Sequence, residues 1–298
     1  METIAARLPS PPAKALPEGA ADCHAHVFGP LDRFPTGPST YAIPLADPAV
    51  YEGMLASAGF TRGVLIQPAP YGQDTQALEN ALAQFGGRVK GIAVADDSIS
   101  DERLYALDRA GVRGLRFIEM LDPKSGRRYA GSVGIDALKA LAPRMKPLGW
   151  HAQIWAKCAD IPRIFHAIEP FGLPVVFDHM GQYDAAGGAS GKIFAAFLDV
   201  MRSERAYTKL SLCRLSQKTP GYEDLRAFHD ALVETAPDRL LWGSDWPFVR
   251  MGANSPDVTH LVDIFAKWVK DEGLIHRILV DNPKRLFDFS AVDKISGL

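Results

Sequence analysis

The chain has 298 residues, of which 47% are hydrophobic and 23% charged, and its 33 basic and 35 acidic side chains give a formal net charge of −2. This composition excludes a disordered chain, which would be poor in apolar residues and rich in one sign of charge. It also excludes nucleic acid as a partner bound through overall positive charge, because no basic excess exists to neutralise phosphates.

The cysteines and the hydropathy pattern indicate the compartment. Cys23, Cys158 and Cys213 lie far apart and form neither a disulfide framework nor a paired metal-binding motif, which favours a reducing compartment. No apolar run approaches the roughly 20 residues that span a bilayer, and residues 1–20 lack the apolar core of a secretory signal. We therefore expect a cytoplasmic protein without a membrane partner, and the sequence leaves a homo-oligomer open.

Short β-rich runs alternate along the chain with longer segments of helical periodicity. Eight strands are predicted, at residues 21–27, 63–67, 89–95, 112–117, 151–155, 174–177, 207–212 and 240–243. Helices are predicted between them, for example at 75–85, 101–110, 135–147, 193–203, 222–235 and 258–271. A long Pro- and Gly-rich connection, at about residues 28–48, follows the first strand.

Eight strand–helix units in one chain of this length favour a single-domain (β/α)8 TIM barrel at residues 19–298. A doubly wound sheet would usually carry a Gly-rich phosphate loop after its first strand, whereas here that strand ends in Cys23-His24-Ala25-His26. Residues 1–18 are rich in proline, and we expect them to form an extended N-terminal arm on the surface.

A barrel brings the C-terminal ends of its strands to one active site, so the residues at these ends matter most. His24 and His26 lie two apart on the first strand, so their side chains point to the same face. The other polar residues at predicted strand ends are Arg116, Asp178, His179, Arg214 and Asp245.

Each of these residues alone has an ordinary structural explanation. His179 could be a packed core histidine, Asp245 could cap a helix N-terminus, and Arg116 or Arg214 could pair with acidic loops. Trp155 is expected to be a wall residue of the site. Together, at the mouth of one barrel, the polar residues predict a functional site.

The pattern resembles the amidohydrolase superfamily, whose signature is His-x-His on the first strand and Asp on the eighth. The resemblance is closer to its 2-pyrone-4,6-dicarboxylate lactonase-like branch. It spans residues 17–289 and is carried by the stretches 22–30, 62–67, 111–117, Asp178-His179-Met180-Gly181, 242–247 and Asp281-Asn282-Pro283.

This resemblance implies hydrolysis of a carboxylated lactone such as 2-pyrone-4,6-dicarboxylate, a muconolactone or a sugar-acid lactone. By the same resemblance, Asp245 is the base that activates water, and His24, His26 and His179 surround the lactone carbonyl. Arg116 and Arg214 would hold substrate carboxylates, and Tyr41 would be a loop tyrosine near the substrate.

Three positions depart from the dicarboxylate lactonase pattern. Asp122 and Gln182 stand where those enzymes carry arginine, and Trp155 stands where they carry tyrosine. Gln182 and Trp155 remain expected substrate-binding residues. The set of cationic side chains is therefore smaller in this chain.

The residue types suit ester hydrolysis without reference to any family. A carboxylate can take a proton from water, histidine N–H groups can stabilise an oxyanion, and an arginine can hold a carboxylate by two hydrogen bonds. His24, His26 and Asp245 could also hold Zn²⁺ or Mn²⁺, with Glu119 or His179 as a further ligand. The fifth strand offers Trp155 instead of a further histidine, and metal-free catalysis is favoured.

We therefore expect a hydrolase acting on the carboxylic ester bond of a small anionic lactone, from aromatic or sugar-acid breakdown. The alternatives are a zinc-dependent amidohydrolase or carboxy-lyase of the same superfamily, and a barrel that binds a ligand without turnover. Tight metal binding would favour the zinc-dependent enzyme. Ligand binding without hydrolysis would favour the barrel that binds without turnover.

Overall fold

Eight parallel strands form the centre of the computed structural model, which describes residues 8–122 and 125–289. Each strand pairs with the next one in the chain, which confirms the predicted single-domain (β/α)8 TIM barrel. The strands are β1 (Ala21–Ala25), β2 (Arg62–Ile66), β3 (Val89–Ala93), β4 (Val112–Ile118), β5 (His151–Trp155), β6 (Val175–Phe177), β7 (Ala206–Leu210) and β8 (Leu240–Trp242).

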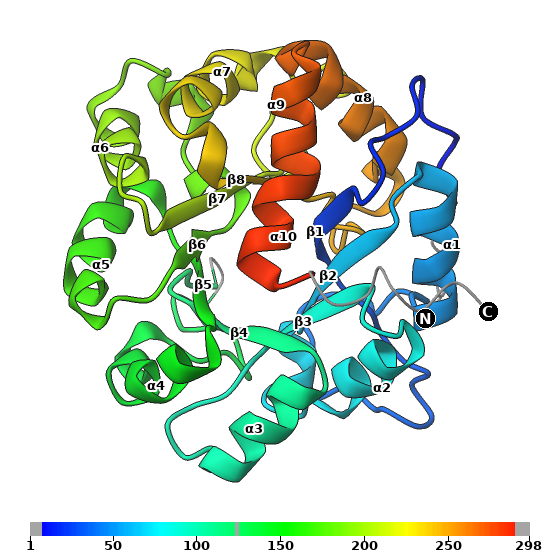
Figure 1. The fold of residues 1–298 in the computed structure, drawn as a ribbon, viewed down its shortest axis with the longest axis vertical. Helices are drawn as coiled ribbons and strands as arrows, with labels where there is room; N and C mark the ends of the chain where they lie inside the picture. Colours follow the sequence, from blue (N-terminus) through cyan, green and yellow to red (C-terminus); the bar gives the residue numbers. More distant parts are fainter. Residues whose placement is uncertain (1–7, 123–124, 290–298) are drawn as a thin grey trace.

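Helices cover the outside of the barrel and one of its two ends (Figure 1). They are α1 (Pro48–Ala58), α2 (Gln76–Gln84), α3 (Asp101–Arg109), α4 (Leu138–Met145), α5 (Ile161–Ile168), α6 (Lys192–Met201), α7 (Arg226–Thr235), α8 (Val258–Val269), α9 (Glu272–His276) and α10 (Asn282–Phe287). Five of the six predicted helices contain an observed one, and the sixth, predicted at 193–203, overlaps α6, which begins one residue earlier. The largest difference is at α7, which begins at Arg226 because Glu223–Leu225 forms a 3-10 turn.

Helix ends follow local signals in the sequence. The Asp47 side chain accepts a hydrogen bond from the Val50 N–H, and Pro48 occupies the first turn of α1, where its missing N–H has no cost. Gly59 ends that helix at φ +81°, a left-handed conformation that favours glycine. Ser100 and Asp257 cap α3 and α8 in the same way as Asp47.

The barrel closes between β1 and β8 through backbone hydrogen bonds beyond the end of β8. The His26 N–H donates to the Trp246 carbonyl at 2.8 Å, and the Asp245 N–H donates to the His24 carbonyl at 2.8 Å. The register of β1 shifts between Asp22 and Ala25. Closure therefore brings the histidines of the first strand beside the aspartate that follows the eighth.

An apolar cluster fills the barrel interior below the mouth. It includes Cys23, Ile66, Ile92, Val176 and Leu241 from five different strands. At the opposite end α10 crosses the barrel opening (Figure 1), and its residue Phe287 packs into the same cluster. The site therefore opens at the C-terminal ends of the strands.

The described part of the N-terminal arm lies along the helices at the end of the chain. The Ser10 N–H donates to Asp257, the Ala13 N–H donates to Asp263 of α8, and Lys14 pairs with Glu272 of α9. Residues 1–7 of the expected arm and 290–298 of the expected barrel domain lie outside the described residues. Within the described ranges, every helix is too short or too polar to cross a bilayer.

Candidate active site

Three predicted residues meet at the barrel mouth around one carboxylate oxygen. Oδ1 of Asp245 lies 3.5 Å from Nε2 of His24 and 3.3 Å from Nε2 of His26. All three side chains are almost completely buried. A carboxylate is thus held against two imidazoles where solvent hardly reaches it.

Asp22, just before the histidines, fixes this arrangement from below. Its Oδ1 atom accepts hydrogen bonds from the N–H groups of His24 and Ser244, and Oδ2 accepts from the Ser244 hydroxyl. A Cβ on Gly243 would lie 2.7 Å from Cβ of His24, so only glycine fits there. Asp22 therefore joins β1 to the segment that carries Asp245.

The backbone at two of the predicted catalytic residues adopts a conformation that non-glycine residues rarely take. Asp245 has φ +63° and His179 has φ +50°. Such positions cost free energy and persist where surrounding structure holds them, often at functional sites. Both residues carry polar side chains into the mouth in spite of that cost.

The two histidines of β1 are held through their other ring nitrogens. Nδ1 of His26 lies 2.7 Å from the Ile66 carbonyl oxygen, so it carries a proton and donates it there. Nδ1 of His24 lies 3.1 Å from Nζ of Lys209 on β7. Burial lowers the pKa of His24 well below its usual value, and the imidazole is neutral.

Lys209 is completely buried beneath the histidines and was not among the predicted site residues. Its Nζ atom lies 2.7 Å from Oε1 of Gln153 and 3.4 Å from Oδ1 of Asp178. Burial lowers the pKa of Lys209, whereas Asp178 opposes that shift. Lys209 is thus held by hydrogen bonds to His24 and Gln153 and by an ion pair with Asp178.

Arg116 and Arg214 both contact site carboxylates. Nη2 of Arg116 lies 3.4 Å from Oδ2 of Asp178, and Nε of Arg214 donates to Oδ2 of Asp245. Burial would raise the pKa of Asp245, but Arg214, followed by the neighbouring histidines, holds it well below the usual carboxyl range. Asp245 is therefore ionised at neutral pH.

His179 completes the cluster of imidazoles. Its ring centroid lies 4.8 Å from that of His24, and burial lowers the pKa of His179 to about 4. Among the described residues, its Nδ1 atom has no hydrogen-bond partner. This ring is neutral at pH 7 and has a nitrogen free for a ligand.

The other expected substrate-binding residues surround this centre. Nε1 of Trp155 donates to Oε1 of Gln182 at 2.9 Å, and the indole packs edge-on against His179. Burial raises the pKa of Tyr41, although the positive charges of nearby Arg116 and Arg250 act to lower it. The structure therefore brings together all nine residues expected to act in catalysis or substrate binding.

Glu119, expected as a further metal ligand, is engaged elsewhere. One of its carboxylate oxygens accepts hydrogen bonds from Arg128 and from the Ile135 N–H. In the described ranges, the groups of metal-ligand type at the mouth are His24, His26 and Asp245, and His24, Asp178 and His179.

The first of these groups fits a metal ion in spacing. Tetrahedral Zn²⁺ with bonds of about 2.0–2.1 Å has ligand atoms roughly 3.4 Å apart, close to the 3.3 and 3.5 Å measured from Asp245 Oδ1 to the histidines. The Ile66 carbonyl also orients His26 in the way that second-shell acceptors orient metal-binding histidines. Nδ1 of a metal-binding histidine usually donates to an acceptor, whereas Nδ1 of His24 faces the Lys209 ammonium. The charge around this group therefore suits a metal ion less well than its spacing does.

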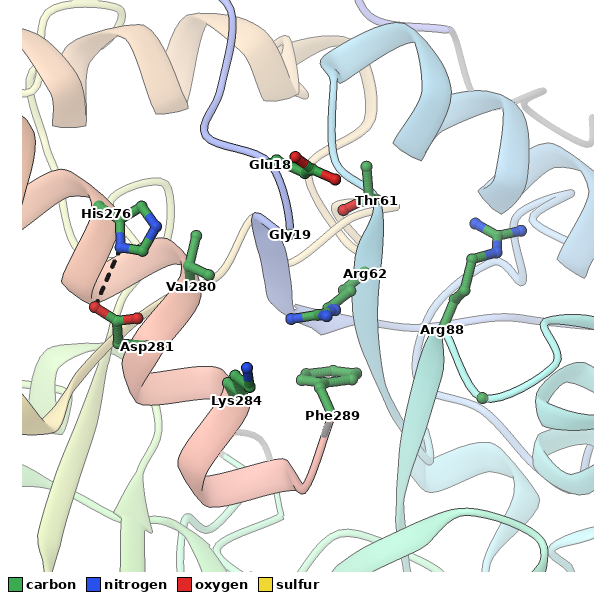
Figure 2. Close-up of a pocket in the computed structure, with 11 residues that line it drawn as sticks. Glu18, Gly19, Thr61, Arg62, Arg88, His276, Val280, Asp281, Lys284 and Phe289 are labelled. Carbon is green, nitrogen blue, oxygen red and sulfur yellow. Dashed lines mark hydrogen bonds and ion pairs between the residues drawn. The ribbon is translucent and has the colours of Figure 1, made fainter. Parts of the chain in front are cut away.

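Two pockets lie outside the catalytic cluster. One of about 570 Å³ lies at the mouth and is bordered by Tyr41, Phe248 and Arg250. The other, of about 540 Å³, lies at the opposite end of the barrel (Figure 2). There Arg62, Lys284 and Phe289 face a hollow that contains none of the catalytic groups.

Sequence reasoning missed Lys209, Gln153 and the role of Asp22. A signal for Lys209 was present, since a charged residue stands inside a predicted apolar strand, and buried lysines are rare unless paired. Gln153 is the equivalent polar residue on β5. Their partnership crosses the barrel and could be recognised only after the fold was known.

Comparisons with known proteins agree with this geometry. The sequence profile of the amidohydrolase family matches residues 21–289. A 2-pyrone-4,6-dicarboxylate hydrolase from Comamonas testosteroni is 36% identical over 290 residues, covering 94% of this chain and 93% of that protein. A 4-sulfomuconolactone hydrolase from Rhizobium radiobacter is 31% identical over 277 residues, covering 92% and 91%.

A solved structure is also similar. It is that of a probable 2-pyrone-4,6-dicarboxylic acid hydrolase from Acinetobacter baumannii with citric acid bound. It is 26% identical, covers 91% of this chain and 99% of that chain, and superposes with a TM-score of 0.78. The family profile spans all eight strands and the segments that carry the site.

Proposed function

The chain belongs to the amidohydrolase family, and on that premise we propose that it opens a carboxylated lactone by attack of water on the ring carbonyl. The observation that carries the proposal is the ionised Asp245 held between His24, His26 and Arg214. The lactone hydrolases among its relatives support a substrate of that class.

In this mechanism Asp245 accepts a proton from water while the water oxygen attacks the carbonyl carbon. Arg214 binds the carboxylate oxygen that faces away from the histidines, so it keeps the other oxygen turned toward the site. The ester bond then breaks, and the proton on Asp245 passes to the leaving ring oxygen. Asp245 is thereby returned to its ionised form.

His24 serves as the donor for the developing oxyanion. Because Lys209 donates to Nδ1, the single proton of the neutral ring stays on Nε2, which faces the site. One good donor of this kind contributes about 3–4 kcal/mol to transition-state stabilisation. Lys209 acts through His24, and we describe it as a positioning residue.

Arg116 lies between Asp178 and the Trp155 ring, at the edge of the cluster. Its guanidinium keeps further N–H groups for a substrate carboxylate. Fixing that carboxylate orients the lactone carbonyl toward Asp245. Orientation of this kind can contribute several kcal/mol.

We propose that the reaction proceeds without a metal. Lys209, Arg116 and Arg214 already supply three cations against the carboxylates of Asp22, Asp178 and Asp245, so these charges balance without a divalent ion. When bound by His24, His26 and Asp245, Zn²⁺ or Mn²⁺ would supply a Lewis acid and a more acidic water. The steps derived above use only side chains of this chain.

We place the enzyme in the cytoplasm, in the breakdown of aromatic compounds or sugar acids. All three cysteines are free and buried, which suits a reducing compartment. Carboxylated lactones are intermediates of the chemistry that opens such rings.

The test is a hydrolysis screen over lactones with one and two carboxylates, each with and without chelator. We expect turnover of at least one carboxylated lactone and little turnover of the uncharged analogues. Absence of hydrolysis across the panel would contradict the proposal.

The spacing of His24, His26 and Asp245 favours one second candidate, a zinc-dependent hydrolase or carboxy-lyase. That function requires a firmly held metal. Elemental analysis of the purified protein separates the two candidates, because one metal ion per chain is expected only for the second.

A further inference from the structure

Arg250 lies at the barrel mouth and takes no part in the hydrolytic steps proposed for Asp245 and His24. Its guanidinium carbon lies 5.2 Å from the ring centre of Tyr41 and 5.1 Å from that of Tyr129. Nη1 donates to the Tyr129 hydroxyl at 3.4 Å, and Nη2 donates to Oγ1 of Thr40. Two aromatic rings and two hydroxyls thus hold this exposed cation in one place.

Both tyrosines connect Arg250 to the catalytic cluster. Tyr129 stacks on Trp155 at 5.6 Å between ring centres, and Trp155 packs against His179. Tyr41 lies close enough to Arg116, Asp245 and Arg250 for their charges to affect its pKa. Arg250 therefore stands above the site, on the side from which a substrate enters.

Arg250 differs from the deeper arginines in its partners. Arg116 and Arg214 each contact a site aspartate, whereas in the described part of the chain no carboxylate pairs with Arg250. A guanidinium has five N–H donors, and only two of its nitrogens have partners here. The remaining donors can hold an anion by two hydrogen bonds.

We propose that Arg250, held between Tyr41 and Tyr129, binds a second acidic group of the substrate, on the part of the lactone that lies farthest from the scissile carbonyl. This inference rests on the proposed function. The pocket of about 570 Å³ bordered by Tyr41 and Arg250 gives room for such a group. A lactone with two separated anionic groups would then be bound by Arg116 at one group and by Arg250 at the other.

The test compares a dicarboxylated lactone with its analogue in which the distal carboxylate is an amide. For Arg250→Gln we expect KM for the dicarboxylate to rise about tenfold, the low end for a charge-assisted bond at an exposed site, with kcat unchanged. KM for the amide should stay within about threefold. Arg250→Lys should recover part of the loss, since it keeps the charge without the planar fork.

The matched control is Arg226→Gln on α7, because Arg226 also packs over an aromatic ring, that of Trp268, but far from the mouth. It should change neither KM. Equal effects of Arg250→Gln on the dicarboxylate and the amide would overturn the proposal, and so would no effect on either.

A binding measurement separates this inference from the proposed function. Titration calorimetry with citrate, which carries three carboxylates and no lactone, should give a Kd about tenfold weaker for Arg250→Gln than for wild type or Arg226→Gln. If no lactone is hydrolysed but citrate binding depends on Arg250, hydrolysis fails and the anion subsite stands. A citrate Kd that is the same in all three proteins would refute the subsite.

Discussion

Nζ of Lys209 lies 3.1 Å from Nδ1 of His24, although 185 residues separate the two in the chain. Both side chains are completely buried. On the proposed mechanism, this contact keeps the proton of His24 on Nε2, the nitrogen that would donate to a substrate. Lys209 would then control that hydrogen bond without touching the substrate.

We expect Lys209→Met to lower kcat about 10–100-fold, the effect of losing one hydrogen bond to a charged group. The tautomer of His24 should become mixed, as measured by ¹⁵N chemical shifts of the imidazole. Lys90→Met is the control, because Lys90 is a buried lysine that lies over Phe289 at the other end of the barrel. A variant at Lys209 with an unchanged tautomer would contradict its positioning role.

Asp245→Asn should abolish hydrolysis while leaving the fold and substrate binding intact, because the amide keeps the shape but cannot accept a proton. General base catalysis contributes typically 10²–10⁴-fold to the rate. Steady-state kinetics and thermal unfolding test the two halves of this prediction. If Asp245→Asn retained more than about a tenth of wild-type kcat, Asp245 would be excluded as the base. The control is Asp230→Asn, because Asp230 belongs to an exposed ion pair on the surface.

Arg116→Met and Arg214→Met should each raise KM for an anionic lactone by about one to two decades. Arg214→Met should have a second effect, because Arg214 lowers the pKa of Asp245. Without it that pKa rises, so on acidification activity should be lost at a higher pH than in wild type. If neither KM nor the pH at which activity is lost on acidification changes, the two arginines have a structural role alone.

Activity should survive exhaustive chelation and fall at low pH as Asp245 becomes protonated. The inflection should lie below the usual carboxyl range, since the pKa of Asp245 is held well below it. The measurement is kcat/KM against pH, before and after chelation. Loss of activity that Zn²⁺ or Mn²⁺ restores would recast His24 and His26 as metal ligands.

The folded state should lose stability as the pH falls below about 6.5. Burial lowers the pKa of His151 to about 3 and that of His229 to about 4, so between these values and 6.5 only the unfolded chain takes up protons. Each of these histidines lowers the free energy of unfolding by about 1.4 kcal/mol for every pH unit between 6.5 and its own pKa in the folded state. His229→Phe, far from the mouth on α7, should give a shallower decline of unfolding free energy from pH 6.5 to 4.5, measured in urea. An unchanged slope would contradict this assignment.

The sequence determined the barrel and most of the site because both depend on local patterns. Eight apolar runs separated by helical periodicity predict eight parallel strands, and every one lies where it was expected. Polar residues at the ends of such strands must converge, so His24, His26, His179 and Asp245 could be assigned to one mouth before any coordinates existed.

Only the tertiary structure decided the partners of those residues. Lys209 contacts His24 and Gln153 because β7, β1 and β5 face one another across the barrel. Arg250 contacts Tyr41 and Tyr129 because three separate loops fold over the mouth of the barrel. The two deeper arginines, expected to hold substrate carboxylates, also contact Asp178 and Asp245, which no pattern in the sequence indicates. Periodicity fixes which way a side chain points along its own strand, but the distance to a charge on another strand depends on how the barrel closes.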